Sequence, residues 1–359
     1  MKILITAGGT GGHIYPALSI IKKIKELEPN SEFIYVGTHD RMEKDIVPKY
    51  NIEYIGLEIY GLSKKDMIRN FKNVSLIIKA YNKCKKIIRE FKPDVVIGVG
   101  GYVTYPVILA AHSLKVKTFI HEQNSIPGKS NKMLERFVDK IGISFLESSK
   151  YFKDQNKIIH TGNPCSENAL EVKEIKKGKF GLKNEKKLVL IVSGSLGSNV
   201  INEKMIDFLN SISNKDYEVL YVTGKNYYEE FNKHKFSNNV KVVSYIENMS
   251  GLLKNVDVIV SRAGASSISE IVALKIPSII IPSPYVANNH QYYNALSLKE
   301  NNACIMIQEK DLNKDILMNS IDKCLDDKFS KTLKENMKKL EINDSSLIIY
   351  NVLKDMIGE

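Results

Sequence analysis

Tryptophan is absent from this chain, and cysteine is scarce and scattered. Among the 359 residues there is no Trp, and the four cysteines are Cys84, Cys165, Cys304 and Cys324. This separation lacks the short spacing of metal-ligating or redox-active pairs, so it excludes such sites and favours a reduced, cytoplasmic protein. Without Trp, any aromatic anchor at a membrane surface has to be Tyr or Phe.

Long apolar runs are missing as well. The longest apolar segments have the length of strands, far below the roughly 20 residues that a membrane span needs. At the N-terminus only Ile3 to Ile5 are apolar before the polar Thr6. We therefore expect a strand there and no signal peptide, because a signal peptide requires a longer apolar stretch.

Acidic residues are under-represented in one half of the chain. The net charge is +11, from 52 Lys and Arg against 41 Asp and Glu. Residues 1–160 hold 26 basic and 16 acidic side chains, and residues 161–359 hold 26 and 25. The basic surplus of +10 therefore belongs to the N-terminal half, where we expect the partner that it attracts.

Strand-like runs alternate with helical patterns along the whole chain. The first series of strand-like runs comprises 2–7, 33–38, 94–101, 118–123, 141–144 and 157–164. The second comprises 187–195, 217–224, 240–246, 256–261, 277–283 and 303–308. Two successive β-α-β series predict an α/β protein with two doubly wound parallel sheets. Longer helices are predicted up to about Leu27, over 64–91 and over 345–357, and the lysine-rich stretch 164–187 is the best candidate for a linker.

The stretch 256–295 organises the second half. A buried strand at its start is followed by Gly264, and then Ser267 and Glu270 have the S-x-x-E spacing of a capping box that opens a helix. A helix that starts directly after a strand leaves backbone N–H groups pointing at whatever lies beyond the sheet edge. These features predict a ligand site, and the alternative is that Ser267 and Glu270 only cap a helix.

Glycine-rich or polar loops follow several other predicted strands. The first is Gly8-Gly9-Thr10-Gly11-Gly12-His13, which lacks the third glycine of a dinucleotide fingerprint and the Gly-Lys-Ser/Thr of a Walker loop. Two interpretations of this loop remain, a phosphate-binding loop of another kind and a tight structural turn. His13 would contact the ligand in the first and would be a packing residue in the second. Similar loops occur at 98–101, 121–124 and 193–198. As a set they predict a cleft between two domains that binds a phosphate-containing ligand.

Five motifs in order carry a resemblance to a known family. GGTGGHIYP opens the chain, HEQNSIPGKSN and TGNP follow, and SRAGASSISE precedes HQYYNA. In these motifs the chain resembles the MurG family of N-acetylglucosaminyltransferases, over residues 1–302. The resemblance implies a two-domain GT-B hexosyltransferase of the family 28 type, with two Rossmann-like domains that face each other across a cleft.

The resemblance also implies the reaction and the division of labour. The family transfers N-acetylglucosamine from UDP-N-acetylglucosamine to lipid-linked N-acetylmuramyl-pentapeptide pyrophosphoryl-undecaprenol, a step of peptidoglycan and cell-wall synthesis. Residues 1–163, with the helix 345–359 packed back on them, would bind the acceptor and the membrane. Residues 164–344 would bind the donor. The expected location is the cytoplasmic side of the cell membrane, as a peripheral protein, and no nucleic acid partner is expected.

Carried over motif by motif, the resemblance implies a role for each matching residue. Glu270 would hold the ribose hydroxyls, Ser195 the diphosphate region and Ile246 the uracil. Gln291 and Asn124 would contact the sugar. The residues whose backbone would face the diphosphate are Ala265, Ser266, Ser267, Ile268 and Ser269, and those that would line the reaction centre are Thr10, Gly11 and Gly12.

His13 is the implied general base for a direct displacement with inversion, since the unperturbed pKa of imidazole, about 6.5, lies near working pH. Glu122 is a reserve candidate with an alternative structural role. The chain has no Asp-x-Asp, so we expect no metal and no other cofactor, and N–H groups would have to neutralise the leaving diphosphate. The family usually has an arginine two residues after TGNP, where this chain has the uncharged Ser166 as the candidate contact.

Other functions share this architecture. A glycosyltransferase with another lipid acceptor would share the donor loop, and a UDP-sugar 2-epimerase would share the fold but is expected to place several carboxylates in its cleft. A nucleotide-regulated binding protein without turnover is a third alternative.

The helical stretch from Lys64 to Lys92 carries ten basic and two acidic residues. Its apolar residues form two stripes, 67, 71, 74, 78, 81 and 88 in one and 77, 84, 87 and 91 in the other. The alternative is a surface helix that buries one face in the core and has a solvated lysine face opposite. One packed face needs only one stripe, so we expect this helix to dock on an anionic membrane surface.

Overall fold

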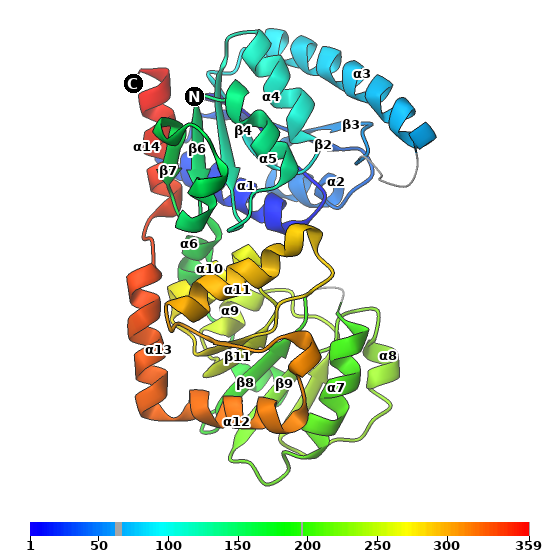
Figure 1. Cartoon of the computed structure of the whole chain (residues 1–359), viewed down its shortest axis with the longest axis vertical. Helices are drawn as coiled ribbons and strands as arrows, with labels where there is room; N and C mark the ends of the chain where they lie inside the picture. The colour runs from blue at the N-terminus through cyan, green and yellow to red at the C-terminus, as the bar shows by residue number, and fades with distance from the viewer. Residues whose placement is uncertain (62–66, 195–196, 359) are drawn as a thin grey trace. The chain divides into compact units, whose positions relative to one another are not determined.

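The computed structural model describes residues 1–61, 67–194 and 197–358, and the side chains of 67–72 are not described. The chain divides into two compact units. Unit 1 consists of Met1–Cys165 together with Ile342–Glu359, and unit 2 of Ser166–Glu341. Figure 1 shows the elements of each unit with their labels.

Within the described residues, unit 1 is built on a seven-stranded sheet in which every strand pairs in parallel, in the order β3-β2-β1-β4-β5-β6-β7. The strands are β1 (Lys2–Ala7), β2 (Glu32–Thr38), β3 (Glu53–Leu57), β4 (Val95–Gly100), β5 (Lys117–Glu122), β6 (Lys140–Ile143) and β7 (Ile158–His160). The sequence pattern did not predict β3, because its EYIGL run is short and interrupted by glycine.

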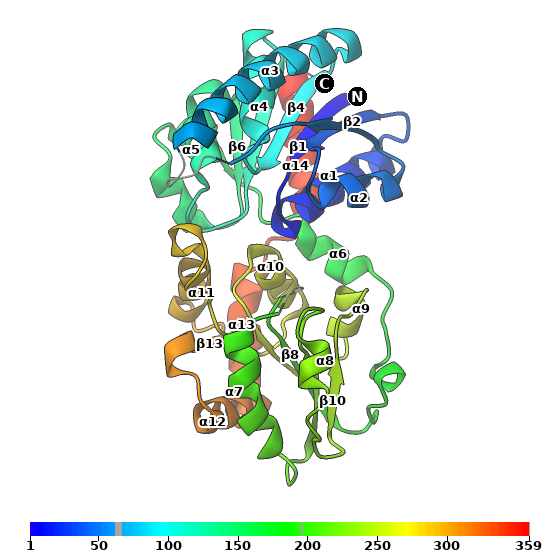
Figure 2. The ribbon, with the colours of Figure 1, turned by 90° about the vertical axis from the view of Figure 1, so that its right-hand side faces the viewer.

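Helices cover both faces of this sheet because alternate strand residues are apolar on both sides. Ile3 and Ile5 pack on the side of α1 (Gly11–Leu27) and α14 (Ser345–Ile357), whereas Leu4 packs on the other side. That other side is covered by α3 (Met67–Phe91), α4 (Thr104–Ser113) and α5 (Lys129–Leu134). Figure 2 shows α3 with α4 and, separately, α14 beside the strands β1 and β4. A short helix, α2 (Glu43–Ile46), follows β2.

Unit 2 repeats the plan with a six-stranded parallel sheet, again counted over the part of the chain that the structure describes. Its order is β10-β9-β8-β11-β12-β13, with β8 (Lys187–Val192), β9 (Tyr217–Val222), β10 (Val240–Val243), β11 (Val258–Ser261), β12 (Ser278–Ile280) and β13 (Ile305–Met306). The helices are α6 (Cys165–Glu171), α7 (Asn199–Asn210), α8 (Tyr228–Phe231), α9 (Met249–Leu253), α10 (Ala265–Leu274), α11 (His290–Glu300), α12 (Lys314–Leu325) and α13 (Asp327–Leu340). The predicted pair of doubly wound parallel sheets is confirmed.

The stretch proposed as a linker is packed on unit 2. The backbone N–H of Ile175 donates to the carbonyl of Gly251 at 2.9 Å, and the ammonium of Lys254 donates to the carbonyls of Leu170 and Val172, each at 2.6 Å. Lys177 is buried and donates to the carbonyl of Lys186. The linker prediction was wrong because this stretch is bonded to unit 2 through its backbone, even though most of its lysines are exposed.

No helix in the described parts of the chain is long and apolar enough to cross a membrane.

Glu28, at the end of α1, ties α14 to the N-terminus of the chain. Its carboxylate accepts hydrogen bonds from the amino group of Met1 at 3.1 Å, the hydroxyl of Tyr350 at 2.8 Å and the ammonium of Lys354 at 2.9 Å. Lys354, Tyr350 and the N-terminus lower the pKa of Glu28 to about 2, against the opposing effect of burial. Helix α14 also buries Ile349 and Leu353 completely, so both apolar contacts and ion pairs hold α14 on unit 1.

Glu28→Gln is therefore expected to destabilise unit 1 in a pH-dependent way. Because the folded pKa lies below that of the unfolded chain, the stabilising effect is present above about pH 4.5 and is lost as the pH falls toward 2. We expect a loss of about 1–3 kcal/mol at pH 7, discounted for partial exposure. Denaturant unfolding at pH 7 and pH 3 checks this, and an equal loss at both values would contradict it.

Candidate functional site

In unit 1 the strand order reverses between β1 and β4, and this is where open α/β sheets bind ligands. The loop after β1 starts with Gly8 and Gly9, and the pairing of β1 with β4 shifts register between Thr6 and Ala7. Gly9 has φ +91, and a Cβ on Gly101 would lie 2.5 Å from the carbonyl oxygen of Gly8. Glycine is therefore required for the two loops to approach each other this closely.

His13 lies in the first turn of α1, half-buried between these loops. Its Nδ1 lies 3.1 Å from the carbonyl oxygen of Gly8 and 3.4 Å from the hydroxyl of Thr10. Because a carbonyl can only accept, Nδ1 carries the proton in the neutral ring and Nε2 keeps a lone pair. A Cβ on Gly100 would lie 2.6 Å from Cδ2 of His13, so the glycine leaves room for the ring.

The residues before His13 form the N-terminus of α1. Thr10 is the N-cap, with an extended backbone and no side-chain capping bond, and its carbonyl accepts from the N–H groups of His13 and Ile14. The N–H groups of Gly11 and Gly12 come before the first of these bonds, so they have no acceptor within the helix. The structure thus brings Thr10, Gly11, Gly12 and His13 together at one helix start.

Glu43 lies under the same loop, and sequence reasoning missed it. Its side chain is fully buried and accepts from the backbone N–H of Gly9 at 3.1 Å and from Thr38, through the N–H at 3.0 Å and the hydroxyl at 2.6 Å. Nothing in the local pattern RMEKD distinguishes this glutamate from an exposed helix residue. Only the fold brings it to the glycine loop.

Glu122, the reserve candidate for a base, has its carboxylate occupied by four donors. One oxygen accepts from the N–H and the side-chain amide of Asn124, at 2.9 and 3.2 Å. The other accepts from the N–H of Gly128 at 2.9 Å and the amide of Asn131 at 2.8 Å. Glu122 therefore shapes the loop after β5 and orients Asn124.

A second buried network joins β5 to β7. His121 is fully buried, and its Nε2 donates to the carbonyl of Gly162 at 2.9 Å while its Nδ1 accepts from the amide of Gln123 at 2.9 Å. Burial lowers the pKa of His121 to about 4, so the ring is neutral near pH 7. Shortly after this junction comes Ser166, buried at the start of unit 2 and without the charge of the family arginine.

In unit 2 the reversal lies between β8 and β11, and α10 starts after β11. The N-cap of α10 is Gly264, which makes no side-chain cap, and the first helical bond runs from the N–H of Ile268 to the carbonyl of Gly264. The preceding N–H groups, of Ala265, Ser266 and Ser267, have no acceptor within the helix. The predicted capping box is wrong, because the helix begins two residues before Ser267.

Glu270 is bonded instead to the neighbouring helix α9. The hydroxyl of Ser250 donates to its carboxylate at 2.5 Å. Burial raises the pKa of Glu270 to about 7, against the opposing effect of this hydrogen bond. A carboxylate in this position has the acceptor oxygens that a vicinal diol needs.

Arg262, at the end of β11, joins three segments of unit 2. Its guanidinium donates to the carbonyl of Ile281 at 3.2 Å and to the hydroxyl of Ser198 at 3.0 Å, and it forms a buried ion pair with Glu309. Ser198 is the N-cap of α7, so Arg262 positions the end of the loop after β8. Ser195, the predicted diphosphate contact in this loop, lies outside the described residues.

Two further predicted contacts follow other strands of unit 2. Ile246 is buried in the loop between β10 and α9. Ser250, in the first turn of α9, bonds to Glu270 of α10. Gln291 lies in the first turn of α11, and its side-chain oxygen accepts from the N–H of Ser283 at 2.9 Å. Ser269 donates to the carbonyl of Ser266 at 2.7 Å.

Comparison with known proteins agrees with this architecture. Residues 3–143 match the glycosyltransferase family 28 N-terminal domain, and residues 188–352 match its C-terminal domain. A Bacillus pumilus protein is 44% identical over 99% of both chains, and it is named UDP-N-acetylglucosamine--N-acetylmuramyl-(pentapeptide) pyrophosphoryl-undecaprenol N-acetylglucosamine transferase. The chain belongs to the MurG family.

Solved structures show the shared fold of this MurG-family chain. Acinetobacter baumannii MurG superposes with a TM-score of 0.77 at 22% identity, over 99% of this chain and 100% of that one. A putative UDP-N-acetylglucosamine 2-epimerase from Listeria monocytogenes gives 0.73 at 13% identity, over 98% and 95%. At such identities the likeness shows the fold alone.

The raised pKa of Glu270 predicts an effect on stability. Between about pH 4.5 and 7 the unfolded chain ionises at this position while the folded chain stays protonated, so the free energy of unfolding falls over this window. Glu270→Gln removes the effect, and we expect it to be more stable than the parent by about 1–3 kcal/mol at pH 8 and equal to it at pH 4.5. Denaturant unfolding measures both, with Glu300→Gln on the exposed surface of α11 as the control. A gain that does not depend on pH would contradict the assignment.

Proposed function

We propose that this chain transfers N-acetylglucosamine from UDP-N-acetylglucosamine to the N-acetylmuramyl sugar of a pentapeptide pyrophosphoryl-undecaprenol acceptor. The proposal is supported by relatives of that name at 44% identity over the full length. The observation that carries it is His13, whose Nδ1–H donates to a backbone carbonyl, so that the lone pair of the neutral ring is on Nε2.

Unit 2 would hold the donor. The ribose hydroxyls donate to Glu270, and the diphosphate accepts from the N–H groups at the start of α10, where the helix dipole stabilises an anion by ~0.3–1 kcal/mol. Ile246 would contact the uracil, and Gln291 with Asn124 the sugar. The proposed diphosphate contacts also include Ser195 and the backbone of Ile268 and Ser269, and Ser166 takes the place of the family arginine.

The chemical step would be a single displacement. The oxygen of the acceptor hydroxyl attacks the anomeric carbon of the donor sugar. The bond between that carbon and the diphosphate oxygen of UDP breaks, and the configuration at the carbon inverts. Nε2 of His13 removes the hydroxyl proton, which turns the ring into an imidazolium. The electron pair of the broken bond leaves on the diphosphate, and preorganised N–H groups stabilise its charge without reorganisation.

Two variants separate the base from the donor site. His13→Ala is expected to lower turnover ~100-fold or more, the usual contribution of a general base, with nearly unchanged affinity for UDP. Glu270→Ala is expected to weaken UDP binding by ~1.5–3 kcal/mol at pH 8, where the carboxylate is ionised, because it removes a charge-assisted acceptor. Release of UDP that depends on the lipid acceptor measures turnover, and calorimetry measures UDP affinity.

Each variant is the control for the other. Release of UDP without any acceptor would point to an epimerase or hydrolase, and binding without release to a nucleotide-regulated protein. Wild-type turnover in His13→Ala would remove the base assignment, and unchanged UDP affinity in Glu270→Ala would leave Glu270 as a structural residue.

We also propose that α3 docks unit 1 on the anionic cytoplasmic face of the membrane. One side of α3 buries Leu76, Ala80, Cys84, Ile87 and Ile88. On the other side, Val74 and Ile78 are 51% and 56% exposed. These exposed apolar residues lie among lysines, the combination that binds an anionic lipid surface.

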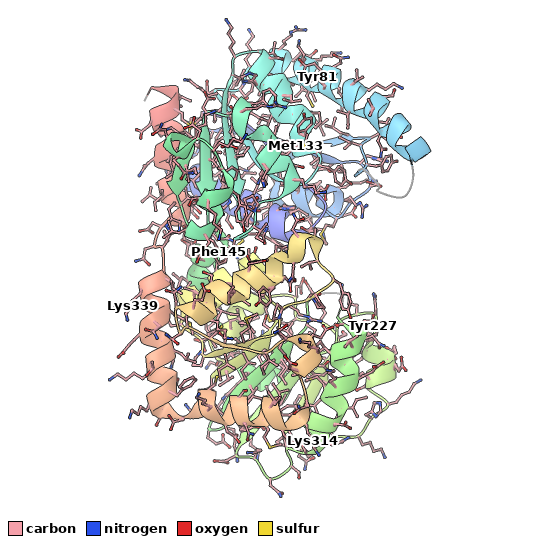
Figure 3. All side chains as sticks on the ribbon, viewed as in Figure 1. Tyr81, Met133, Phe145, Tyr227, Lys314 and Lys339 are labelled. Atoms are coloured by element: carbon pink, nitrogen blue, oxygen red, sulfur yellow. The ribbon has the colours of Figure 1, made fainter. Side chains whose placement is uncertain are left out.

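Tyr81, labelled in Figure 3, was also expected on this face, but it is partly buried against the core of unit 1, with the ammonium of Lys85 5.4 Å from its ring centre. Met67 and Phe71, also expected on this face, have no described side chains.

Vesicle sedimentation checks the docking proposal. We expect binding to anionic vesicles at low salt, release of much of the protein at ~0.5 M salt by screening, and weaker binding after charge reversal at Lys79, Lys83 and Lys86, with UDP affinity spared. Lys83 also donates to the carbonyl of Gly56 at 3.0 Å, so Lys83→Glu alone is tested for folding. Reversal at the exposed Lys331, Lys334 and Lys338 of α13 is the matched control. Equal losses in both triple variants would contradict the proposal.

A further inference from the structure

The peptide group between Gly8 and Gly9 is hydrogen-bonded at both ends. Its carbonyl oxygen, on Gly8, lies 3.1 Å from Nδ1 of His13. Its N–H, on Gly9, donates to Oε2 of Glu43 at 3.1 Å. In a trans peptide these two groups point in opposite directions within one plane, so Glu43 and His13 are bound to opposite ends of the same amide.

Glu43 is held rigidly in this position. It is fully buried, and its second oxygen accepts both donors of Thr38. All its partners donate, and a carboxylate is an acceptor at both oxygens. Removing a carboxylate from water costs several kcal/mol unless hydrogen-bond donors compensate it. The burial of Glu43 therefore points to a role beyond that of an ordinary helix residue.

We infer that Glu43 is a positioning residue that acts on His13 through the Gly8–Gly9 peptide. The inference rests on the proposed role of His13 as the base. The carboxylate draws the N–H of Gly9 toward it, which increases the electron density on the carbonyl oxygen of Gly8. That oxygen then accepts more strongly from Nδ1–H, because hydrogen bonds in a chain polarise one another.

Two consequences follow for the ring. The carbonyl holds His13 as the Nδ1–H tautomer, so that Nε2 is the acceptor. When Nε2 takes a proton, the positive charge that develops is stabilised by the polarised carbonyl and by the negative charge beyond it. Glu43 would thus have the orienting and stabilising effect of the carboxylate in a Ser-His-Asp triad, with a peptide group between carboxylate and imidazole.

The glycines have a specific part in this arrangement. A Cβ on Gly8 would lie 2.6 Å from Oε1 of Glu43. Gly9 adopts φ +91, a left-handed conformation that turns its N–H toward the carboxylate. The run of glycines is therefore needed on the side of Glu43 as well as on the side of a ligand.

The titratable and charged groups near Glu43 come from its own segment and from neighbouring strands. They are Tyr35 on β2, Tyr54 on β3, Tyr102 after β4 and Arg41, with the carboxylates of Asp40 and Asp45 acting on Tyr54. The pKa values of the three tyrosines are raised by burial, and the pKa of Arg41 is raised by a hydrogen bond to Tyr102. The three tyrosines and Arg41 therefore keep their charge state between pH 6 and 9.

Nitrogen NMR of histidine-labelled full-length protein tests the inference on the unaltered chain. We expect the neutral ring of His13 to be the Nδ1–H tautomer, with its resonances assigned by loss in His13→Ala. The Nε2–H tautomer would overturn the inference. This measurement needs no activity and no altered carboxylate, so it remains decisive even if the following variant does not fold.

Glu43→Gln removes the charge and places an NH2 group against an N–H donor. We expect the titration midpoint of His13 to fall by about one pH unit, a tenfold change, and kcat to fall 10-fold or more. The KM for UDP-N-acetylglucosamine should stay within twofold, since the proposed donor contacts lie mainly in unit 2. The acidic limb of the pH–rate profile should move with the NMR midpoint.

Glu28→Gln is the matched control, because Glu28 is also a multiply bonded carboxylate of unit 1 but does not contact the glycine loop. It should lower stability and leave the His13 titration unchanged. If Glu43→Gln leaves the midpoint of His13 unchanged, or if Glu28→Gln shifts it equally, the inference is overturned. If His13→Ala keeps full turnover, the base assignment fails, and the NMR midpoints still test the link between Glu43 and His13.

Discussion

In each unit the order of the parallel strands reverses once, and the rest of the structure depends on this reversal. The loops that leave the two strands at a reversal turn to opposite faces of the sheet, so backbone groups are exposed at the edge between them. In unit 1 these are the loops after β1 and β4, which meet at His13 and Gly100. In unit 2 they are the loops after β8 and β11, which Arg262 joins through Ser198. Both candidate sites therefore begin from one topological constraint.

Four carboxylates with hydrogen-bond donors around them, Glu28, Glu43, Glu122 and Glu270, have different roles because their donors differ. Glu28 binds two cations, and the pKa of its carboxyl falls to about 2. Glu270 has the hydroxyl of Ser250 as its hydrogen-bond donor, and burial raises its pKa to about 7. Glu43 and Glu122 accept mainly from backbone N–H groups and amides, and they shape loops. The same side chain thus has a lowered pKa, a raised pKa or a role in loop geometry, according to the donors around it.

Much of the fold followed from the sequence because parallel strands buried on both faces are continuous apolar runs. The runs at 2–7 and 187–195 and the helices ending at Leu27 and Phe91 correspond to observed elements. The failures occurred where composition and contact disagree. Lysine-rich composition suggested a linker at 164–187, but the backbone of this stretch is bonded to Gly251 and Lys254 of unit 2. The spacing of Ser267 and Glu270 suggested a capping box, but α10 begins at Ala265.

The sequence by itself determined the α/β class, the glycine loops and the order of motifs that marks the MurG family, because these depend on neighbouring residues. The tertiary structure alone decided which polar residues meet. Glu43 reaches the Gly8–Gly9 peptide only because β2 pairs with β1, and Ser250 reaches Glu270 only because α9 packs on α10. Such contacts join residues that are 20 to 34 positions apart. A hydrogen bond forms only within about 3 Å, and a local pattern carries no information on that distance.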